Sequence, residues 1–325
     1  MEVDAAPMRV RAWQPVDDLD VAALLGPGVD PLWASQFHAL HGAPRDGERW
    51  RRTLVAEVDG RVVGAATAAR NRVHPDRFTC AVDVRPSHRR RGVGRRLLAA
   101  VRSSRPEPLP LMSKLRPADG AALGFLAAAG GGVRQRCPGQ VVDTGDPRVL
   151  AWADQHRDSA NSCAADGADL VVGSLQAISA QELAEAFTAQ YLWVHASWAP
   201  VPPGPPRRAL AEVAAATTAD ADRALSSGAW WRGRLVATVF VFAAGDRWEA
   251  VAETVVRDVH SVGVPDELTG ADVLRRALAR TVLEVAARGG AQVELDGHED
   301  DPHLQLALHG LPLAARRALL LVTAP

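Results

Sequence analysis

Two segments far apart in the chain have the same strand–turn–strand pattern, and this repeat limits the folds that the chain can adopt. Residues 56–68 (AEVDGRVVGAATA) and 229–241 (AWWRGRLVATVFV) each place two apolar runs around a turn that contains Gly-Arg. The Asp59-Gly60 pair between apolar runs is typical of a two-residue β-hairpin. A chain of 325 residues has room for two domains, and the repeated hairpin predicts one in each half.

The elements around the two hairpins also follow one order. In the first half we expect strands at 8–13, 54–58, 61–66, 78–84, 109–115 and 133–142, and helices at 17–25, 93–101 and 121–129. In the second half we expect strands at 170–175, 229–241 and 248–256, a strand at 291–295, and helices at 180–193, 272–287 and 303–309. This order predicts two domains of the α+β class, each a mixed, mostly antiparallel sheet flanked by helices.

The expected domain boundary lies in a polar stretch rich in Asp, Ala and Ser. We therefore predict a first domain at 1–148, a linker at 149–168 and a second domain at 169–325.

The segment 82–98 (VDVRPSHRRRGVGRRLL) carries the clearest chemical signal in the chain. An expected strand enters a loop rich in Arg and Gly, and the loop opens a helix. Unpaired N–H groups and the positive end of the dipole at a helix N-terminus suit phosphate, and arginine offers forked donors to phosphate oxygens. Gly92 and Gly94 let the backbone approach an anion closely. The segment predicts a phosphate cradle, with a solvated basic helix start as the alternative.

This segment resembles the acyl-CoA signature of the GCN5-related N-acetyltransferase (GNAT) superfamily, in its tandem two-domain form. That signature is Arg or Gln, two residues, Gly, one residue, then Gly or Ala, and residues 89–94 read Arg-Arg-Arg-Gly-Val-Gly. The resemblance covers the first half and implies an acetyl-CoA site there. The residues that it implies for the cofactor are Val82, Val84, Arg89, Arg90, Arg91, Gly92, Val93, Gly94, Arg95, Asp119 and Phe125.

The second half resembles the same superfamily without its phosphate loop. Gly270-Ala271 echoes the glycines, but no arginine stands three positions before Gly270. Asp266, Glu267 and Asp272 place negative charge near the expected helix start, which would repel a pyrophosphate. We expect a degenerate second domain and one acetyl-CoA per chain.

Acetyl transfer needs a group that removes the proton of the acceptor ammonium, whose pKa is about 10. Asp83 is the carboxylate on the expected strand 78–84, with a solvent-facing or capping aspartate as the alternative. His74 precedes that strand and could relay a proton, or could be a surface histidine. The superfamily often uses a tyrosine as general acid, but Leu126 stands where it is expected, and the chain's one tyrosine is Tyr191.

Composition excludes several other classes. The net charge of −1 gives no electrostatic footprint for nucleic acid, and no apolar stretch reaches the length that spans a bilayer. Cys80, Cys137 and Cys163 fit no zinc spacing, and we expect no metal. The acidic run 294–301 could attract a polycation, or could be a charged turn with Asp301 and Pro302 at a helix start. We expect a cytoplasmic protein.

Together these features predict an acyl-CoA N-acyltransferase that moves an acetyl group from acetyl-CoA to the amine of a small molecule, such as an antibiotic or a biosynthetic intermediate. Two alternatives remain open. A non-catalytic acyl-CoA sensor would not need the missing tyrosine, and a protein N-acetyltransferase would need a peptide site for which the sequence has no signature.

Overall fold

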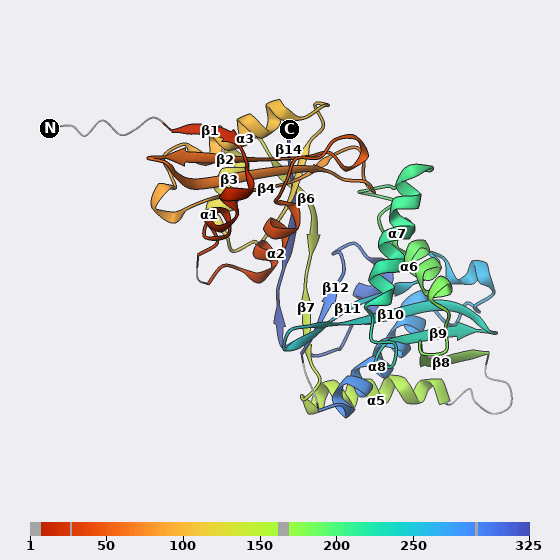
Figure 1. Cartoon of the computed structure of the whole chain (residues 1–325). Coiled ribbons are helices and arrows are strands. Elements are labelled where there is room, and N and C mark those ends of the chain that lie inside the picture. Colours follow the sequence, from red (N-terminus) through yellow and green to blue (C-terminus); the bar gives the residue numbers. More distant parts are fainter. Residues whose placement is uncertain (1–7, 27, 162–168, 290–291) are drawn as a thin grey trace. The chain divides into compact units, whose positions relative to one another are not determined.

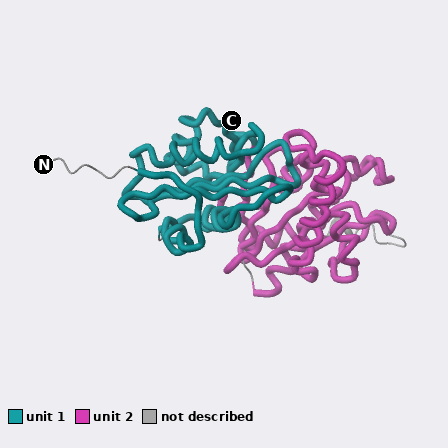
Figure 2. Tube along the Cα trace, turned by 45° about the horizontal axis from the view of Figure 1, so that its top comes forward, with its two compact units in different colours: residues 1–134, 320–325 teal, residues 135–319 magenta. Residues whose placement is uncertain are grey.

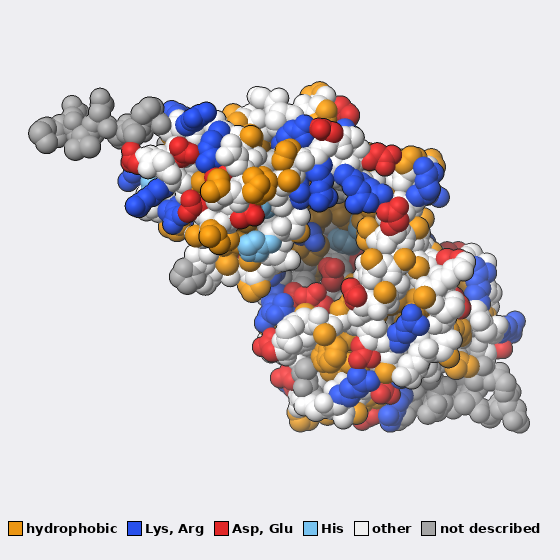
Figure 3. Space-filling model, viewed as in Figure 1, with side chains coloured by type: hydrophobic (Ala, Val, Ile, Leu, Met, Phe, Trp, Pro, Cys, Tyr) orange, Lys and Arg blue, Asp and Glu red, His pale blue; other side chains and the backbone are white. Residues whose placement is uncertain are grey.

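The computed structural model of the chain describes residues 8–26, 28–161, 169–289 and 292–325 (Figure 1). Two compact units make up the chain, Met1–Arg134 with Leu320–Pro325, and Gln135–Leu319 (Figure 2). On the face drawn in Figure 3, basic and acidic side chains are interspersed, in keeping with the net charge of −1. Within the described ranges, no helix is long and apolar enough to cross a membrane.

The first unit is built on a seven-stranded sheet. Its strands, in spatial order, are β1 (Arg9–Ala12), β2 (Arg51–Val58), β3 (Arg61–Arg70), β4 (Phe78–Val84), β5 (Leu111–Leu115), β14 (Leu319–Ala324) and β6 (Gly132–Cys137). β1 to β4 are antiparallel, and β4 and β5 are parallel. Asp59 (φ 50°) and Gly60 (φ 72°) form the expected left-handed turn between β2 and β3.

Helices cover both faces of this sheet. They are α1 (Asp18–Ala22), α2 (Pro31–Leu40), α3 (Val93–Ser104) and α4 (Gly120–Ala128). Side chains of β3 point to both faces of the sheet. Val63 and Ala66 join the core under α3, whereas Val62 and Ala65 join the core under α1 and α2.

The second unit has a sheet of the same kind. In spatial order it contains β8 (Leu170–Ser174), β9 (Ser227–Trp231), β10 (Arg234–Ala244), β11 (Arg247–Thr254), β12 (Gln292–Asp296), β7 (Gln140–Asp143) and β13 (Ala315–Arg316). Only β11 and β12 pair in parallel among the strand pairs described for this sheet. Its helices are α5 (Pro147–Asn161), α6 (Ala180–Val194), α7 (Pro205–Ala219), α8 (Gly270–Ala287) and α9 (Pro302–Ala307). Two α+β domains with one order of elements are thus confirmed.

Each sheet contains one strand that the sequence order would assign to the other half. The last strand of the chain, β14, lies between β5 and β6 in the first sheet. β7 lies between β12 and β13 in the second sheet. The expected closing strand at 133–142 is therefore divided, with β6 in the first sheet and β7 in the second.

The division of the chain accordingly differs from the expected one. Residues from Gln135 onward belong to the second unit, and the last six residues belong to the first. The stretch expected to be a linker carries α5 as far as Asn161, and 162–168 lie outside the described residues. Polar residues hide this helix in the sequence, yet Val149, Trp152 and Ala153 are at most 6% exposed and join the second core.

Helix α2 is tied to the sheet at its first turn. Asp30 caps it by accepting hydrogen bonds from the N–H groups of Leu32 (2.8 Å) and Trp33 (3.4 Å). The other carboxylate oxygen of Asp30 accepts from Nε of Arg116 (3.0 Å), which follows β5. Burial raises the pKa of Asp30, but the Arg116 guanidinium and the two N–H groups outweigh it and hold this pKa below its ordinary value.

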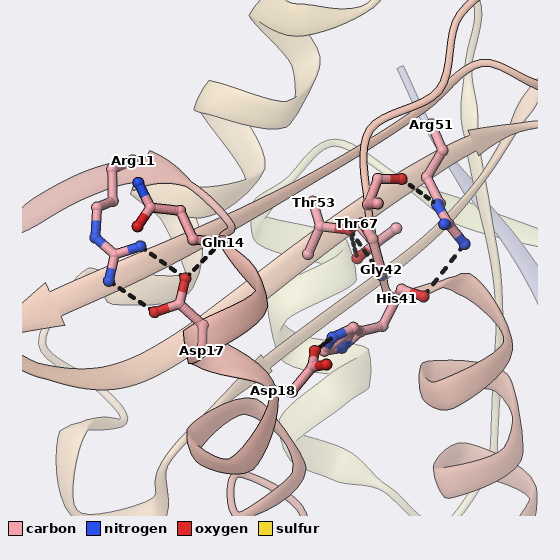
Figure 4. Close-up of polar contacts among 10 residues, drawn as sticks. Arg11, Gln14, Asp17, Asp18, His41, Gly42, Arg51, Thr53 and Thr67 are labelled. Atoms are coloured by element: carbon pink, nitrogen blue, oxygen red, sulfur yellow. Dashed lines mark hydrogen bonds and ion pairs between the residues drawn. The ribbon is translucent and has the colours of Figure 1, made fainter.

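The other end of α2 is also held (Figure 4). His41 ends the helix, and its Nε2 lies 3.1 Å from Oδ1 of Asp18 at the start of α1. The carbonyl of His41 accepts a hydrogen bond from Arg51 of β2 (3.2 Å). These contacts fix the orientation of the α2 side chains that face β4 and β5.

A charge placed on β14 should unfold the first domain, although β14 is the last segment of the chain. Val322 is 2% exposed, so Val322→Asp should cost the first domain about 3 kcal/mol or more of its free energy of unfolding. Thr323→Asp, one position along on the half-buried face, should cost less than about 1 kcal/mol. Denaturant unfolding followed by tryptophan fluorescence measures both, and equal losses would contradict the placement of β14.

The charge of Asp30 should contribute stability that depends on pH. Asn at this position keeps an acceptor for the helix N–H groups but loses the ion pair with Arg116. Because the folded pKa lies below the unfolded value of about 4, wild type should be more stable than Asp30→Asn above pH 4, by less than about 1 kcal/mol. This advantage should fade as the pH falls through the folded pKa. Unfolding free energies at pH 7, 5 and 3 test this, and a pH-independent difference would refute it.

Candidate functional site

A gap between two parallel strands marks the candidate site in the first domain. β4 and β5 pair only at Phe78–Leu111 and Thr79–Met112, and beyond these pairs the strands no longer bond to each other. The N–H of Arg85 donates to Val63 on β3 (2.8 Å), so alternation turns the backbone groups of Val82 and Val84 away from β3 and toward the gap. This is the strand edge that the resemblance assigns to an extended arm of the cofactor.

Helix α3 begins beside this edge with an open N-terminus. Gly92 occupies the cap position in a left-handed conformation (φ 81°) and has no side chain to accept from the first turn. Within the helix the first N–H to find a partner is that of Arg96, which donates to Gly92 (3.1 Å). The N–H groups of Val93, Gly94 and Arg95 therefore have no partner inside the helix, which makes this end an anion site.

The arginines of the preceding loop surround that end. Arg89, Arg90, Arg91, Arg95 and Arg96 are exposed, whereas Val93 is 4% exposed and offers only its backbone. A Cβ on Gly94 would lie 3.3 Å from the Phe125 ring and 3.6 Å from Val84, so helix, strand and α4 approach closely here. The expected phosphate cradle has the strand–loop–helix geometry that it needs.

Asp83 is neither solvent-facing nor a helix cap. It is 8% exposed and its two oxygens accept from different elements. Oδ2 accepts from Nε1 of Trp33 on α2 (2.8 Å), and Oδ1 accepts from the N–H of Val84 (2.7 Å). The guanidinium of Arg89 also reaches Oδ1 (3.3 Å). The carboxylate thus lies at the edge of the gap, between the strand and α2.

His74 lies elsewhere. It is 5% exposed, in the loop before β4, where its N–H donates to Asn71 (2.9 Å). Val84 is at the far end of β4, and seven strand residues at about 3.3 Å each separate the two ends by about 20 Å. The expected relay between His74 and a reaction at Val84 does not fit this distance, and His74 takes no part in the proposal below.

The two residues expected on α4 have different positions. Asp119 caps α4 by accepting from the N–H of Ala122 (2.9 Å), so its carboxylate already has a structural role. Phe125 is 36% exposed with its ring beside Gly94, at the cradle. Leu126, where the tyrosine was expected, packs instead on Gly131, where a Cβ would lie 2.4 Å from its side chain. Phe125 rather than Leu126 is therefore the α4 residue nearest the cradle, and neither carries an acidic proton.

Helix α2 supplies a residue that the sequence did not single out. Gln36 accepts from the N–H of Lys114 on β5 (3.0 Å) and donates to Oγ of Ser113 (3.2 Å). Trp33, one turn earlier, bonds Asp83 on β4. α2 therefore bridges the two strands where they part, a contact that no local pattern in the sequence could reveal.

The matching place in the second domain is closed. At the start of α8, Thr269 Oγ1 accepts from the N–H of Asp272 (3.2 Å) and Asp272 accepts from the N–H of Thr269 (3.0 Å). This capping box satisfies the N–H of Asp272, one of the N–H groups in the first turn of α8, and the N–H of Thr269 before it. A Cβ on Gly270 would lie 2.7 Å from the His303 ring, so His303 also covers the helix end.

The gap beside β11 is filled as well. β11 and β12 pair from Trp248 to Val251 and then part. Glu253, 1% exposed on the unpaired part, accepts from Thr254 N–H (2.8 Å), Leu304 N–H (3.2 Å) and His303 Nδ1 (3.0 Å). The first turn of α9 thus contacts the unpaired end of β11.

The remaining candidates have structural roles. Asp301 precedes Pro302 at the start of α9, as expected, but its carboxylate accepts from the N–H and Nδ1 of His298 (2.6 and 3.1 Å). No group of three or more His, Cys, Asp or Glu side chains in the described part of the chain could hold a metal ion. Cys80 and Cys137 are buried, and burial raises the pKa of Cys80 to about 12; Cys163 lies outside the described residues.

Comparison with known proteins agrees with this geometry. Residues 24–104, from the segment after α1 through α3, match the model of the acetyltransferase (GNAT) family. No curated protein matches the chain in sequence. A tandem GNAT protein from the clavulanic acid biosynthesis pathway is 19% identical with a TM-score of 0.61, and 98% of each chain is covered.

Two further solved structures share the architecture. A GCN5-related N-acetyltransferase from Sphaerobacter thermophilus is 15% identical with a TM-score of 0.58, again over 98% of each chain. A probable N-acyltransferase of unknown function from Enterococcus faecalis V583 is 12% identical with a TM-score of 0.51, over 98% of this chain and 72% of that one. At these identities the likeness shows the fold. The family match covers the loop rich in Gly and Arg within the first domain, and the repeated fold of the whole chain is similar to that of the tandem GNAT structure.

Proposed function

We propose that the first domain binds acetyl-CoA and transfers its acetyl group to the amine of a small molecule, and that the second domain binds no donor. The observation that carries this proposal is the contrast between two matching helix ends. The N-terminus of α3 is open and surrounded by arginine, and that of α8 is closed by a capping box and by His303.

The residues at the open end suit the donor's charge. The N–H groups of Val93, Gly94 and Arg95 would bind its pyrophosphate, and the exposed guanidinium groups of Arg90 and Arg91 would neutralise it. The extended arm of the donor would run along the edge of β4 at Val82. Phe125 would border the arm where α4 meets α3.

Acetyl-CoA supplies a thioester, whose carbonyl carbon bonds to the amine nitrogen as the C–S bond breaks and the thiolate leaves. The N–H of Val84 is the backbone donor placed to stabilise the charge that grows on the carbonyl oxygen. The Asp83 carboxylate, beside that N–H, would accept the proton that the ammonium must lose. The nitrogen loses its second proton to water as the amide forms, and water protonates the thiolate, since Phe125 and Leu126 offer no proton.

The same lack of a proton donor favours a second candidate, a domain that binds acetyl-CoA without turning it over. Release of free CoA thiol in the presence of a panel of small amines separates the two. Sustained release with one of the amines supports the enzyme, whereas donor binding without release across the panel supports the sensor.

Side chains on the two cradle glycines should abolish donor binding. Gly92→Val with Gly94→Val forces a β-branched residue into a left-handed conformation and fills the approach to the helix end. Calorimetry should give one CoA site per chain for wild type and none for this variant. Gly132→Val on the edge strand β6, where a Cβ meets no atom within 4 Å, is the matched control and should bind normally. Two CoA sites in wild type, or normal affinity in the double variant, would overturn the assignment.

Loss of the Asp83 charge should slow turnover and change its pH dependence. Asp83→Asn keeps an acceptor for Trp33 but cannot take a proton, so the rate at pH 7 should fall by about 10² to 10⁴. The deficit should shrink at high pH, where the free amine is abundant. Glu253→Gln, the matching change in the second domain, should keep the wild-type rate once thermal unfolding shows that it is folded. A pH–rate profile identical to wild type in Asp83→Asn would assign the proton to water.

A further inference from the structure

Both backbone groups of Val84 that face the gap have side-chain partners. Its N–H donates to Oδ1 of Asp83 (2.7 Å), and its carbonyl accepts from Nε of Arg89 (2.8 Å). The same guanidinium holds Oδ1 of Asp83 at 3.3 Å through its Nη2. Arg89 therefore closes a small network over the place where a thioester carbonyl would bond.

This network competes with the reaction in two ways. A thioester oxygen can bond the N–H of Val84 only after the Asp83 carboxylate has turned away from it. That carboxylate cannot turn freely while Arg89 holds it, since Trp33 fixes only its other oxygen. The covered state thus blocks both the backbone donor and the proton acceptor.

Arg89 is also the member of the network that a ligand could move. Its side chain is 52% exposed, in the loop that leads to the open end of α3. A diphosphate at that end carries more negative charge than the single carboxylate that Arg89 now meets. Forked bonds from a guanidinium to phosphate oxygens are among the strong charge-assisted hydrogen bonds.

We propose that Arg89 is a positioning residue that couples binding of the donor's diphosphate to binding of its thioester. When a diphosphate occupies the N-terminus of α3, the Arg89 guanidinium turns to it and releases Val84 and Asp83. The N–H of Val84 then becomes available to the thioester oxygen, and the Asp83 carboxylate becomes available to the acceptor ammonium. This inference rests on the proposed donor site and adds a regulatory role for one side chain in it.

In the second domain the corresponding backbone N–H also has a carboxylate partner, but among the described residues no exposed side chain like that of Arg89 holds the carboxylate. Glu253 accepts from the N–H of the residue that follows it, Thr254, as Asp83 does with Val84. Its other partners are His303 and the N–H of Leu304, both on α9. His303 and Leu304 belong to a helix, whereas Arg89 lies in a loop with its side chain exposed.

The coupling can be measured with a donor divided into two parts. S-acetylpantetheine carries the thioester without the diphosphate, and inorganic pyrophosphate supplies the diphosphate alone. In wild type, saturating pyrophosphate at constant ionic strength should raise the affinity for S-acetylpantetheine by about fivefold or more. Pantetheine lacks the thioester carbonyl, so the ratio of its affinities with and without pyrophosphate should be near one. Calorimetry measures both without an acceptor amine.

Arg89→Ala should remove the coupling, because it uncovers the carbonyl of Val84 and lets the Asp83 carboxylate turn away from the N–H of Val84. The ratio should fall to about one, and S-acetylpantetheine alone should bind more tightly to this variant than to wild type. Arg91→Ala is the matched control, because Arg91 is exposed in the same loop. It should bind pyrophosphate more weakly and yet reach the wild-type ratio at saturation. Thermal unfolding checks that both variants are folded.

Three results would overturn the inference: no coupling in wild type, undetectable S-acetylpantetheine binding at saturating pyrophosphate, or wild-type coupling in Arg89→Ala. These outcomes are distinct from failure of the proposed function, which would appear as an absence of binding of intact acetyl-CoA. Normal binding of intact acetyl-CoA with no coupling between its parts would leave the donor site in place and remove only the role of Arg89.

Discussion

The site depends on the early parting of two parallel strands. β4 and β5 bond over only two residue pairs, so the end of β4 has backbone donors and acceptors with no strand beside them. Buried backbone groups must find partners, and in the first domain they find Asp83 and Arg89, both of which are side chains that a ligand can replace. In the second domain the start of α9 contacts the corresponding strand end. The parting of two parallel strands thus leaves a strand end that meets the side chains of Asp83 and Arg89 in the first domain and a helix in the second.

The N-terminus of the helix that follows each of these strands differs between the two domains, and this difference matches the difference between the two strand ends. An uncapped helix end with arginines has unsatisfied donors and positive potential, and an anion completes it. A helix end with a capping box has fewer unsatisfied donors and carries an aspartate of the wrong sign for phosphate. The two domains therefore share a fold and differ in the chemistry of a few residues at corresponding positions.

The exchange of β7 and β14 makes the two domains dependent on one another in stability. Neither half of the chain contains all the strands of its own sheet, because the first sheet needs the last residues and the second needs residues 140–143. Pairing between segments so distant in sequence is entropically costly and slows folding. The first sheet is complete only when the last residues of the chain are present.

The sequence by itself determined the repeated α+β order, the strand β4 and the loop rich in Gly and Arg that opens α3, because these are local signals. Alternation over 78–84, glycines at fixed spacing and arginines before a helix act within a few residues. The tertiary structure decided what local patterns cannot carry. Trp33 meets Asp83 across 50 positions of the chain, Gln36 meets β5, and Arg89 covers Val84. The tertiary structure also places β14 in the first sheet and β7 in the second. His74 lies in the loop before β4, and Asp119 caps α4. These placements depend on which segments the cores bring together rather than on any residue's immediate neighbours.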